Sequence, residues 1–162
     1  MIPTLLFQLA AGIYMGGWYS GEQSAHPFLY GIWGGTVEYR IDPVGIQADV
    51  SVTTIQPGNA VVDVTQVGLS PILYLSRGPA SPFLRAEFGW RRYLLWHRDD
   101  SKTTEAGAYL GAGTGVRVPS GRLAVRPEVR WLHSSFDHGV PTLARSQNDL
   151  VFDIALEFDL WR

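Results

Sequence analysis

The sequence predicts an all-β fold in which eight antiparallel strands close into an up-and-down transmembrane β-barrel, and three observations support this prediction. Eight segments alternate apolar and polar side chains with the period of two that a β-strand requires. The apolar face continues through nearly every segment, while the opposite face is rich in Gly, Arg, Asp and Glu. Lys occurs once, at Lys102, whereas the outside of a water-soluble barrel would be rich in Lys and Glu. An apolar exterior that faces lipid around a polar interior fits this pattern better.

Length and composition limit the alternatives. The 162 residues predict one domain, 1–162, and the formal charge of -2 without a basic stripe predicts no nucleic-acid partner. The absence of Cys excludes disulfides, thiolate catalysis and Cys-based zinc sites. No apolar run reaches the ~18 residues that a membrane-spanning helix needs. No phosphate loop or dinucleotide fingerprint is present, so no cofactor is predicted.

The predicted strands differ in regularity. The fourth is the least regular, because Val62 and Val64 lie on the opposite face from Leu69 and Leu73. A bulge near 66–68 (Gln-Val-Gly) would reconcile its two halves. Closure of the sheet is expected because no edge can remain unpaired in hydrocarbon. The eight segments span about 4–20, 27–41, 44–55, 60–76, 82–97, 105–118, 122–135 and 149–161.

The connections between these strands alternate in length, and aromatic residues gather near the strand ends. Short periplasmic turns and longer outer loops are expected for a barrel of a bacterial outer membrane, so both termini are predicted to be periplasmic. The opening residues 1–7 lack the basic segment of a signal peptide, which an exported barrel is expected to carry, so this feature counts against the outer-membrane barrel. The aromatic residues indicate two interfacial girdles. They are Trp18, Tyr19, Phe28, Tyr93, Trp96, Trp131 and Phe136 toward the loops, and Tyr39, Tyr74, Phe83 and Trp161 toward the turns.

Two parts of the sequence carry a family resemblance. Residues 111–117, the turn 119–121 and the segment 123–131 resemble the penultimate hairpin of small OmpA/OmpX-type outer-membrane barrels. The closing residues 156–162 resemble the C-terminal strand of that family. The family usually ends on an aromatic residue, whereas here Trp161 is penultimate and Arg162 follows. The resemblance implies an eight-stranded barrel in contact with outer-membrane lipid, with lipopolysaccharide and with other envelope proteins.

Strand parity points a set of charged side chains into the interior, which an eight-stranded barrel is just wide enough to fill with side chains. Arg and carboxylate groups can pair bidentately there and satisfy one another. The set therefore predicts a structural salt-bridge plug, with a narrow ion-conducting pore as the alternative. Its members are Glu38, Arg40, Asp49, Arg85, Glu87, Arg91, Glu105, Arg117, Arg126, Glu128, Arg130, Asp153, Glu157 and Asp159.

His133 and Ser135 are the candidate catalytic residues, predicted to face lipid near the outer rim. Their spacing resembles the His-x-Ser motif of outer-membrane lipid A 3-O-deacylases, which implies acyl-ester hydrolysis from the barrel exterior. Those enzymes orient the His with an outward Glu of the last strand. Here Asp149 and Asp153 have inward parity, and Phe136 stands where the family has Asn. The alternative is that both residues lie among lipid headgroups, where polar side chains cost little.

All four histidines are expected toward the outer side of the barrel. Imidazole and carboxylate groups could hold a divalent metal, but no spacing defines a site, so no metal is predicted. Contact with lipopolysaccharide or with water is the expected role. The residues are His26, His97, His133 and His138, with Asp99, Asp100 and Asp137 nearby. The leading functional hypothesis is a non-enzymatic integral outer-membrane protein that stabilises the envelope or presents its outer loops to partners.

Overall fold

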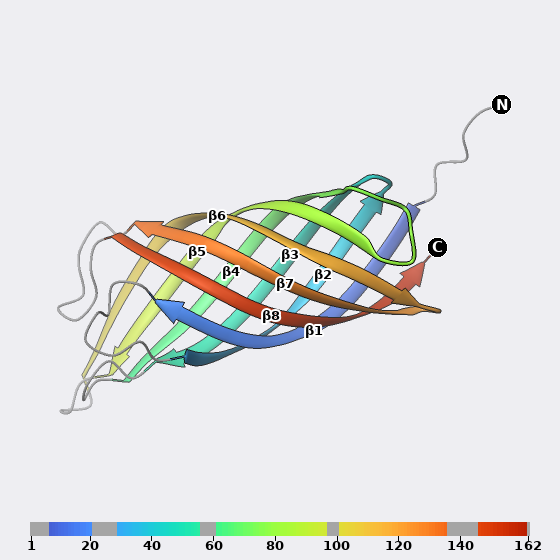
Figure 1. The fold of residues 1–162 in the computed structure, drawn as a ribbon. Coiled ribbons are helices and arrows are strands. Elements are labelled where there is room, and N and C mark those ends of the chain that lie inside the picture. Colours follow the sequence, from blue (N-terminus) through green and yellow to red (C-terminus); the bar gives the residue numbers. More distant parts are fainter. Residues whose placement is uncertain (1–6, 21–28, 56–60, 97–100, 136–145, 162) are drawn as a thin grey trace.

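The computed structural model describes residues 7–20, 29–55, 61–96, 101–135 and 146–161. They form eight antiparallel strands, each paired with the next, and β8 pairs with β1 to close the barrel (Figure 1). The predicted fold class, an all-β antiparallel barrel of eight strands, is confirmed. Within the described ranges, no helix is both long and apolar enough to cross a membrane. The strands are β1 (Phe7–Ser20), β2 (Leu29–Ile41), β3 (Val44–Ile55), β4 (Val61–Tyr74), β5 (Ser81–Trp96), β6 (Lys102–Ser120), β7 (Leu123–Ser135) and β8 (Ser146–Trp161).

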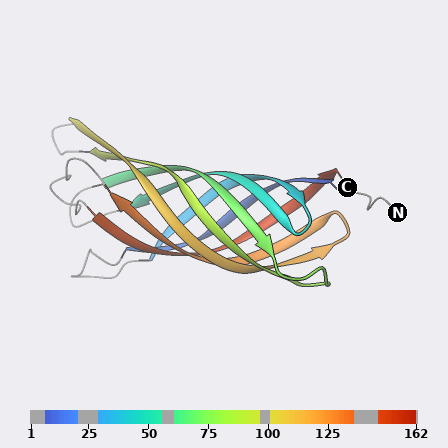
Figure 2. The same ribbon diagram turned by 90° about the horizontal axis from the view of Figure 1, so that it is seen from above.

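The two ends of the barrel differ. The start of β1 and the end of β8 lie at the same end as the β2–β3, β4–β5 and β6–β7 turns, here called the turn end (Figures 1 and 2). The opposite end is called the loop end. Backbone hydrogen bonds fix two of the turns to neighbouring strands, since Tyr74 N of β4 donates to Pro43 O and Asp159 N of β8 donates to Arg122 O, each at 2.8 Å. Gly121 begins the tight β6–β7 turn with a φ of 63°, a left-handed conformation that glycine adopts readily.

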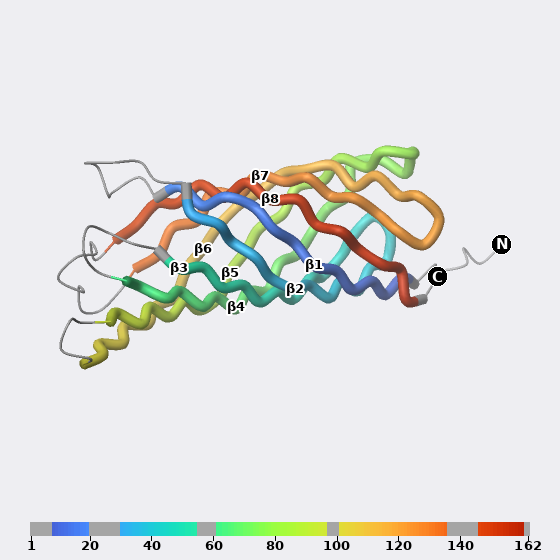
Figure 3. Tube along the Cα trace, turned by 90° about the horizontal axis from the view of Figure 1, so that it is seen from below, coloured from blue at the N-terminus to red at the C-terminus, as the bar shows by residue number. Residues whose placement is uncertain are grey.

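The predicted bulge in the fourth strand is wrong. β4 pairs with β3 in one unbroken register from Ile55↔Val62 to Val44↔Leu73. Val62 and Val64 point into the interior because an apolar cluster fills the barrel at the loop end. The irregularity lies at the closing seam instead, where the register between β1 and β8 shifts between Leu9 and Ala10. This seam, with β1 beside both β2 and β8, is visible in Figure 3.

Pro71 fits into β4 because only one side of the strand is fully paired there. On the β3 side it pairs with Ile46. On the β5 side the register passes from Leu69 to Ile72 and leaves Ser70 and Pro71 without partners. A proline has no N–H to give to a ladder, so an interruption of the ladder is where it can be accommodated.

Burial alternates along the strands and separates an apolar exterior from a polar interior. The outward positions of β8 are all apolar from Leu150 to Leu160, and most are about half exposed. The exterior becomes polar toward both ends of the barrel, which bounds an apolar band around its middle. At the loop end the exposed or half-exposed polar residues include Thr54, Asp63, Arg92, Thr104 and Asn148; at the turn end they include Asp42, Arg77 and Arg122.

Candidate functional site

Two guanidinium groups in the middle of the interior, those of Arg85 and Arg130, share the carboxylates of Glu87 on β5 and Glu128 on β7. Arg130 donates to Asp153 Oδ2 at 2.8 and 3.1 Å and to both carboxylate oxygens of Glu87 at 3.2 Å. Arg85 donates to Glu128 Oε1 at 2.8 Å and lies 3.3 Å from Glu87 Oε2. Glu87 and Glu128 each contact both guanidiniums, so these groups form one network rather than separate pairs.

A second group of ion pairs surrounds Arg126 and Arg117, nearer the turn end. Arg126 Nη1 lies 2.6 Å from Glu157 Oε1 and 3.3 Å from Glu38 Oε2. Glu38 belongs to β2 and Arg126 to β7, so this contact crosses the interior instead of joining neighbouring strands. Arg117 contacts Glu157 at 2.8 Å and Asp159 at 2.6 Å. Glu157 therefore links the two guanidiniums of this group.

Arg91 is the centre of a third group, toward the loop end. Its guanidinium donates to Gln66 Oε1 at 2.9 and 3.1 Å, to Ser134 Oγ at 2.6 Å and to the carboxylate of Asp149. The Trp18 ring lies 4.7 Å away, within cation–π range. Apolar side chains pack in the same region of the interior. They are Ile32, Val62, Val64, Leu95, Leu132 and Val151.

Interior glycines make room for these large side chains. At Gly113, a Cβ would lie 2.9 Å from Arg130 Cγ and 3.1 Å from Arg85 Cγ. At Gly68, a Cβ would lie 2.3 Å from the Tyr109 hydroxyl oxygen. Arg85 and Arg130, the register partners of Gly113 on the strands to either side, and the Tyr109 ring therefore occupy space that a side chain at these glycines would fill.

Most of the charged residues that parity places inside lie in these three groups, and two lie apart. Arg40 is at the turn-end mouth, where its Nε lies 3.5 Å from Asp42 Oδ1 and its guanidinium lies 4.8 Å from the centre of the Tyr74 ring. Glu105, near the loop end of β6, is half-buried and takes part in no ion pair with another described residue. Asp49 joins the middle group through Arg85 Nη2 at 3.4 Å.

Sequence reasoning missed several interior partners. Asp149 was not included in the interior set, although its parity matches that of Asp153, and it pairs with Arg91. Tyr74 donates to both oxygens of Glu38, at 2.8 and 3.0 Å. The assignment of some aromatic residues to interfacial girdles is wrong, because their side chains are buried inside the barrel. These are Trp18, Tyr74, Phe83 and Tyr93.

His133 and Ser135 lie on the outer face of β7 at the loop end. His133 Nδ1 is 3.0 Å from Asn148 Oδ1 on β8, and its ring stacks on Trp131 with centroids 6.1 Å apart. Ser135 is exposed and opposite Ser146 in the register. No carboxylate among the described residues pairs with His133, so an amide stands where an esterase would use an acid to orient the base.

The predicted group of histidines falls largely outside the described residues. This holds for His26, His97 and His138 and for the neighbouring Asp99, Asp100 and Asp137. Within the part of the chain that the structure describes, no three His, Asp or Glu residues come together in a way that could hold a metal ion.

A closed eight-stranded antiparallel barrel with an apolar exterior and a charged interior defines a class: the chain has the architecture of small outer-membrane β-barrels. Neisserial surface protein A is similar over 95% of this chain and 97% of its own, with a TM-score of 0.75 and 16% identity. The N-terminal β-barrel domain of OprF from Pseudomonas aeruginosa gives 0.55 and 13%, over 92% and 97% of the two chains.

Ail, the attachment invasion locus protein of Yersinia pestis, has been solved in complex with the heparin analogue sucrose octasulfate. It gives a TM-score of 0.54 at 10% identity and covers 94% of this chain and 97% of its own. No family model and no curated protein matches the sequence. The predicted resemblance to small OmpA/OmpX-type barrels is confirmed at the level of the fold.

Proposed function

We propose that this chain is a non-enzymatic integral protein of a bacterial outer membrane, with a structural or surface-interaction role and an interior closed to ions. Its apolar band faces lipid, its turn end and termini face the periplasm, and its loop end faces outward. The observation that carries the proposal is the linked set of buried Arg and carboxylate groups inside an apolar exterior. Buried charges need partners, and a membrane-spanning barrel is an environment in which an apolar exterior is stable.

Closure of the interior follows from the contacts inside it. The ion pair from Arg126 on β7 to Glu38 on β2 spans the lumen, and the pair from Arg130 on β7 to Glu87 on β5 reaches over the intervening strand β6. At the turn end of the interior, Arg117 forms ion pairs with both Glu157 and Asp159. An eight-stranded barrel has no room for a water-filled channel beside side chains of this size.

The purified barrel is expected to give no steady conductance in a planar lipid bilayer, because an ion would have to displace several ion pairs at once. The measurement compares the folded barrel with protein-free bilayers and with boiled protein. A steady open level whose conductance changes in Arg126→Ala or Glu128→Gln would refute the closed interior and favour the pore alternative.

The enzymatic alternative, hydrolysis of lipid A acyl esters by Ser135 and His133, lacks one component. A serine nucleophile needs a base that a third group holds in the correct tautomer. The third group beside His133 is the neutral amide of Asn148. We infer that these polar residues lie at the level of the headgroups and bind lipid or water without reacting.

Lipid A incubated with the folded barrel in mixed micelles is therefore expected to keep all its acyl chains. Mass spectrometry of the recovered lipid measures this, and the Ser135→Ala variant serves as the control. Loss of one acyl chain with the unchanged barrel but not with Ser135→Ala would overturn the non-enzymatic proposal.

A further inference from the structure

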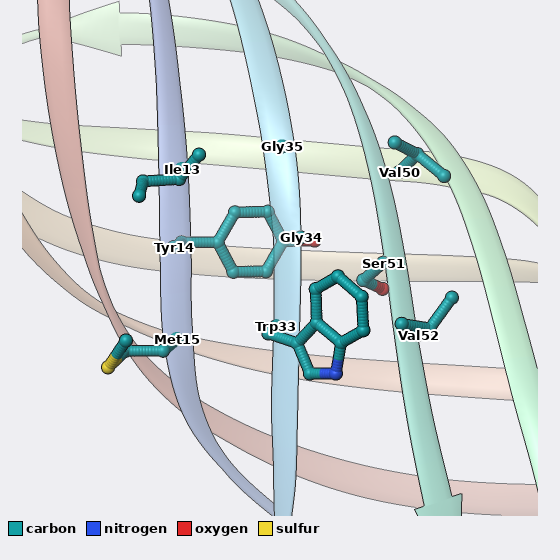
Figure 4. A pocket seen from close by; sticks show the side chains of 9 residues that line it. All are labelled: Ile13, Tyr14, Met15, Trp33, Gly34, Gly35, Val50, Ser51 and Val52. Atoms are coloured by element: carbon teal, nitrogen blue, oxygen red, sulfur yellow. The ribbon is translucent and has the colours of Figure 1, made fainter.

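The lipid-facing wall formed by β1, β2 and β3 contains a groove of about 650 Å³. The side chains of Ile13 and Met15 on one side and of Val50 and Val52 on the other stand around it (Figure 4). Trp33 from β2 completes its lining. This volume is within the ~300–1,000 Å³ typical of sites that take small molecules.

The groove exists because one outward position on β2 is a glycine. Gly35 lies opposite Ile13 on β1 and opposite Val50 on β3, so a side chain at this position would stand between those two. A Cβ built on Gly35 meets no atom closer than Gly12 O at 3.7 Å, which leaves the space open. The neighbouring row, Met15, Trp33 and Val52, carries large side chains and forms one end of the groove.

Trp33 gives the groove a polar group at that end. Its side chain is 66% exposed and leans from β2 toward β3 (Figure 4). No described residue accepts a hydrogen bond from its indole N–H. Thr54, the next outward residue of β3 beyond Val52, is exposed and polar, so this end of the groove lies next to the loop-end boundary of the apolar band. Indole groups prefer that level of a membrane, with the ring in the apolar layer and the N–H toward polar lipid groups.

We propose that the groove is a binding site for one acyl chain of a membrane lipid, with the Trp33 indole N–H donating to the carbonyl oxygen of the ester group that links the chain to its headgroup. This inference rests on the proposed membrane location of the barrel. The groove is continuous with the apolar band, which lipid chains cover. A narrow apolar space with a single hydrogen-bond donor at its polar end matches an ester-linked chain.

Filling the groove tests the proposal. The barrel is folded into dioleoyl-phosphatidylcholine vesicles, extracted into mild detergent and weighed by native mass spectrometry. The unchanged barrel is expected to keep one phosphatidylcholine molecule, and the Gly35→Leu variant to keep about tenfold less, since two fewer buried methylene groups already change a binding constant by that factor. Trp33→Phe is expected to weaken retention to a smaller extent, because only the hydrogen bond is lost.

Gly31→Leu is the matched control. Gly31 is also an outward glycine of β2, and a Cβ there meets nothing within 4 Å, but it does not line the groove. It is expected to keep lipid as the unchanged barrel does. Heat-modifiable gel mobility shows for each protein whether it is a folded barrel, which separates failure of the groove from failure of the membrane proposal. Equal lipid retention in the folded unchanged, Gly31→Leu and Gly35→Leu barrels would overturn the site. A dimer that Gly35→Leu abolishes would also overturn it, since a second copy would then occupy the groove.

Discussion

Replacing Arg130 by Gln is expected to lower the free energy of unfolding by about 3–5 kcal/mol, the cost of leaving buried charges without their partner. Arg130 is the only Arg that pairs with Asp153 among the described residues, and both side chains are about 1% exposed. The variant therefore leaves the buried Asp153 carboxylate without its ion-pair partner. Urea titration of the barrel in lipid vesicles, followed by gel mobility without boiling, measures the change.

Glu128→Gln is the matched comparison, because the network holds more than one carboxylate for each guanidinium that Glu128 contacts. There are three of them: Arg85 keeps Asp49 and Glu87, Arg130 keeps Glu87 and Asp153, and Arg126 keeps Glu38 and Glu157. Glu128→Gln is therefore expected to lower the free energy of unfolding by about 1 kcal/mol, the net value of an ordinary buried hydrogen bond. A loss as large as that of Arg130→Gln would mean that the charges act as independent pairs and would contradict the network described here.

The barrel itself could be predicted from the sequence because each side chain of a strand has only two possible directions, toward lipid or toward the interior. Strand parity assigns a side chain to lipid or to the interior, and most strands carry enough apolar residues on one face to decide between them. The pairs Leu84 and Arg85, or Leu156 and Glu157, show the rule at its clearest, with one residue exposed and the next buried. The charged interior follows from the same rule.

Parity cannot, however, predict what fills the interior at each level. Val62 and Val64 are apolar and yet face inward, because the loop end of this interior is packed with apolar side chains instead of charges. The rule that apolar residues face lipid therefore gives the wrong face there. Trp18 and Tyr93 were placed at the membrane interface for a related reason, since aromatic residues have the same strand preference in a girdle and in a packed interior.

Contacts that cross the lumen could not be predicted from the sequence either. Glu38 and Arg126 are 88 residues apart, and only the diameter and stagger of the closed barrel bring them together. The groove at Gly35 is a comparable case. From sequence, a glycine in a strand indicates a weakened strand or a place where another backbone comes close. Only the register of Gly35 with Ile13 and Val50 shows that this glycine opens a space on the lipid side.

An arginine on the lipid-facing side of β8 is expected to destabilise the barrel strongly in the middle of the apolar band. Ile154 lies midway along β8 and is 57% exposed on the outer face. Ile154→Arg is expected to cost about 2–4 kcal/mol, the cost measured for a guanidinium near the midplane of a bilayer. In a water-soluble barrel, the same change at an exposed position would alter stability by only about 0.5 kcal/mol. Urea unfolding in lipid vesicles gives the value.

Ser146→Arg provides the control on the same strand and face. Ser146 begins β8 at the loop end, beyond the apolar band, so its replacement is expected to cost about 0–1 kcal/mol. The difference between the two variants depends on depth in the membrane and not on arginine as such, since both positions are exposed in the barrel. Equal costs at the two positions would show that lipid does not surround the exterior, and would remove the basis of the proposed membrane location.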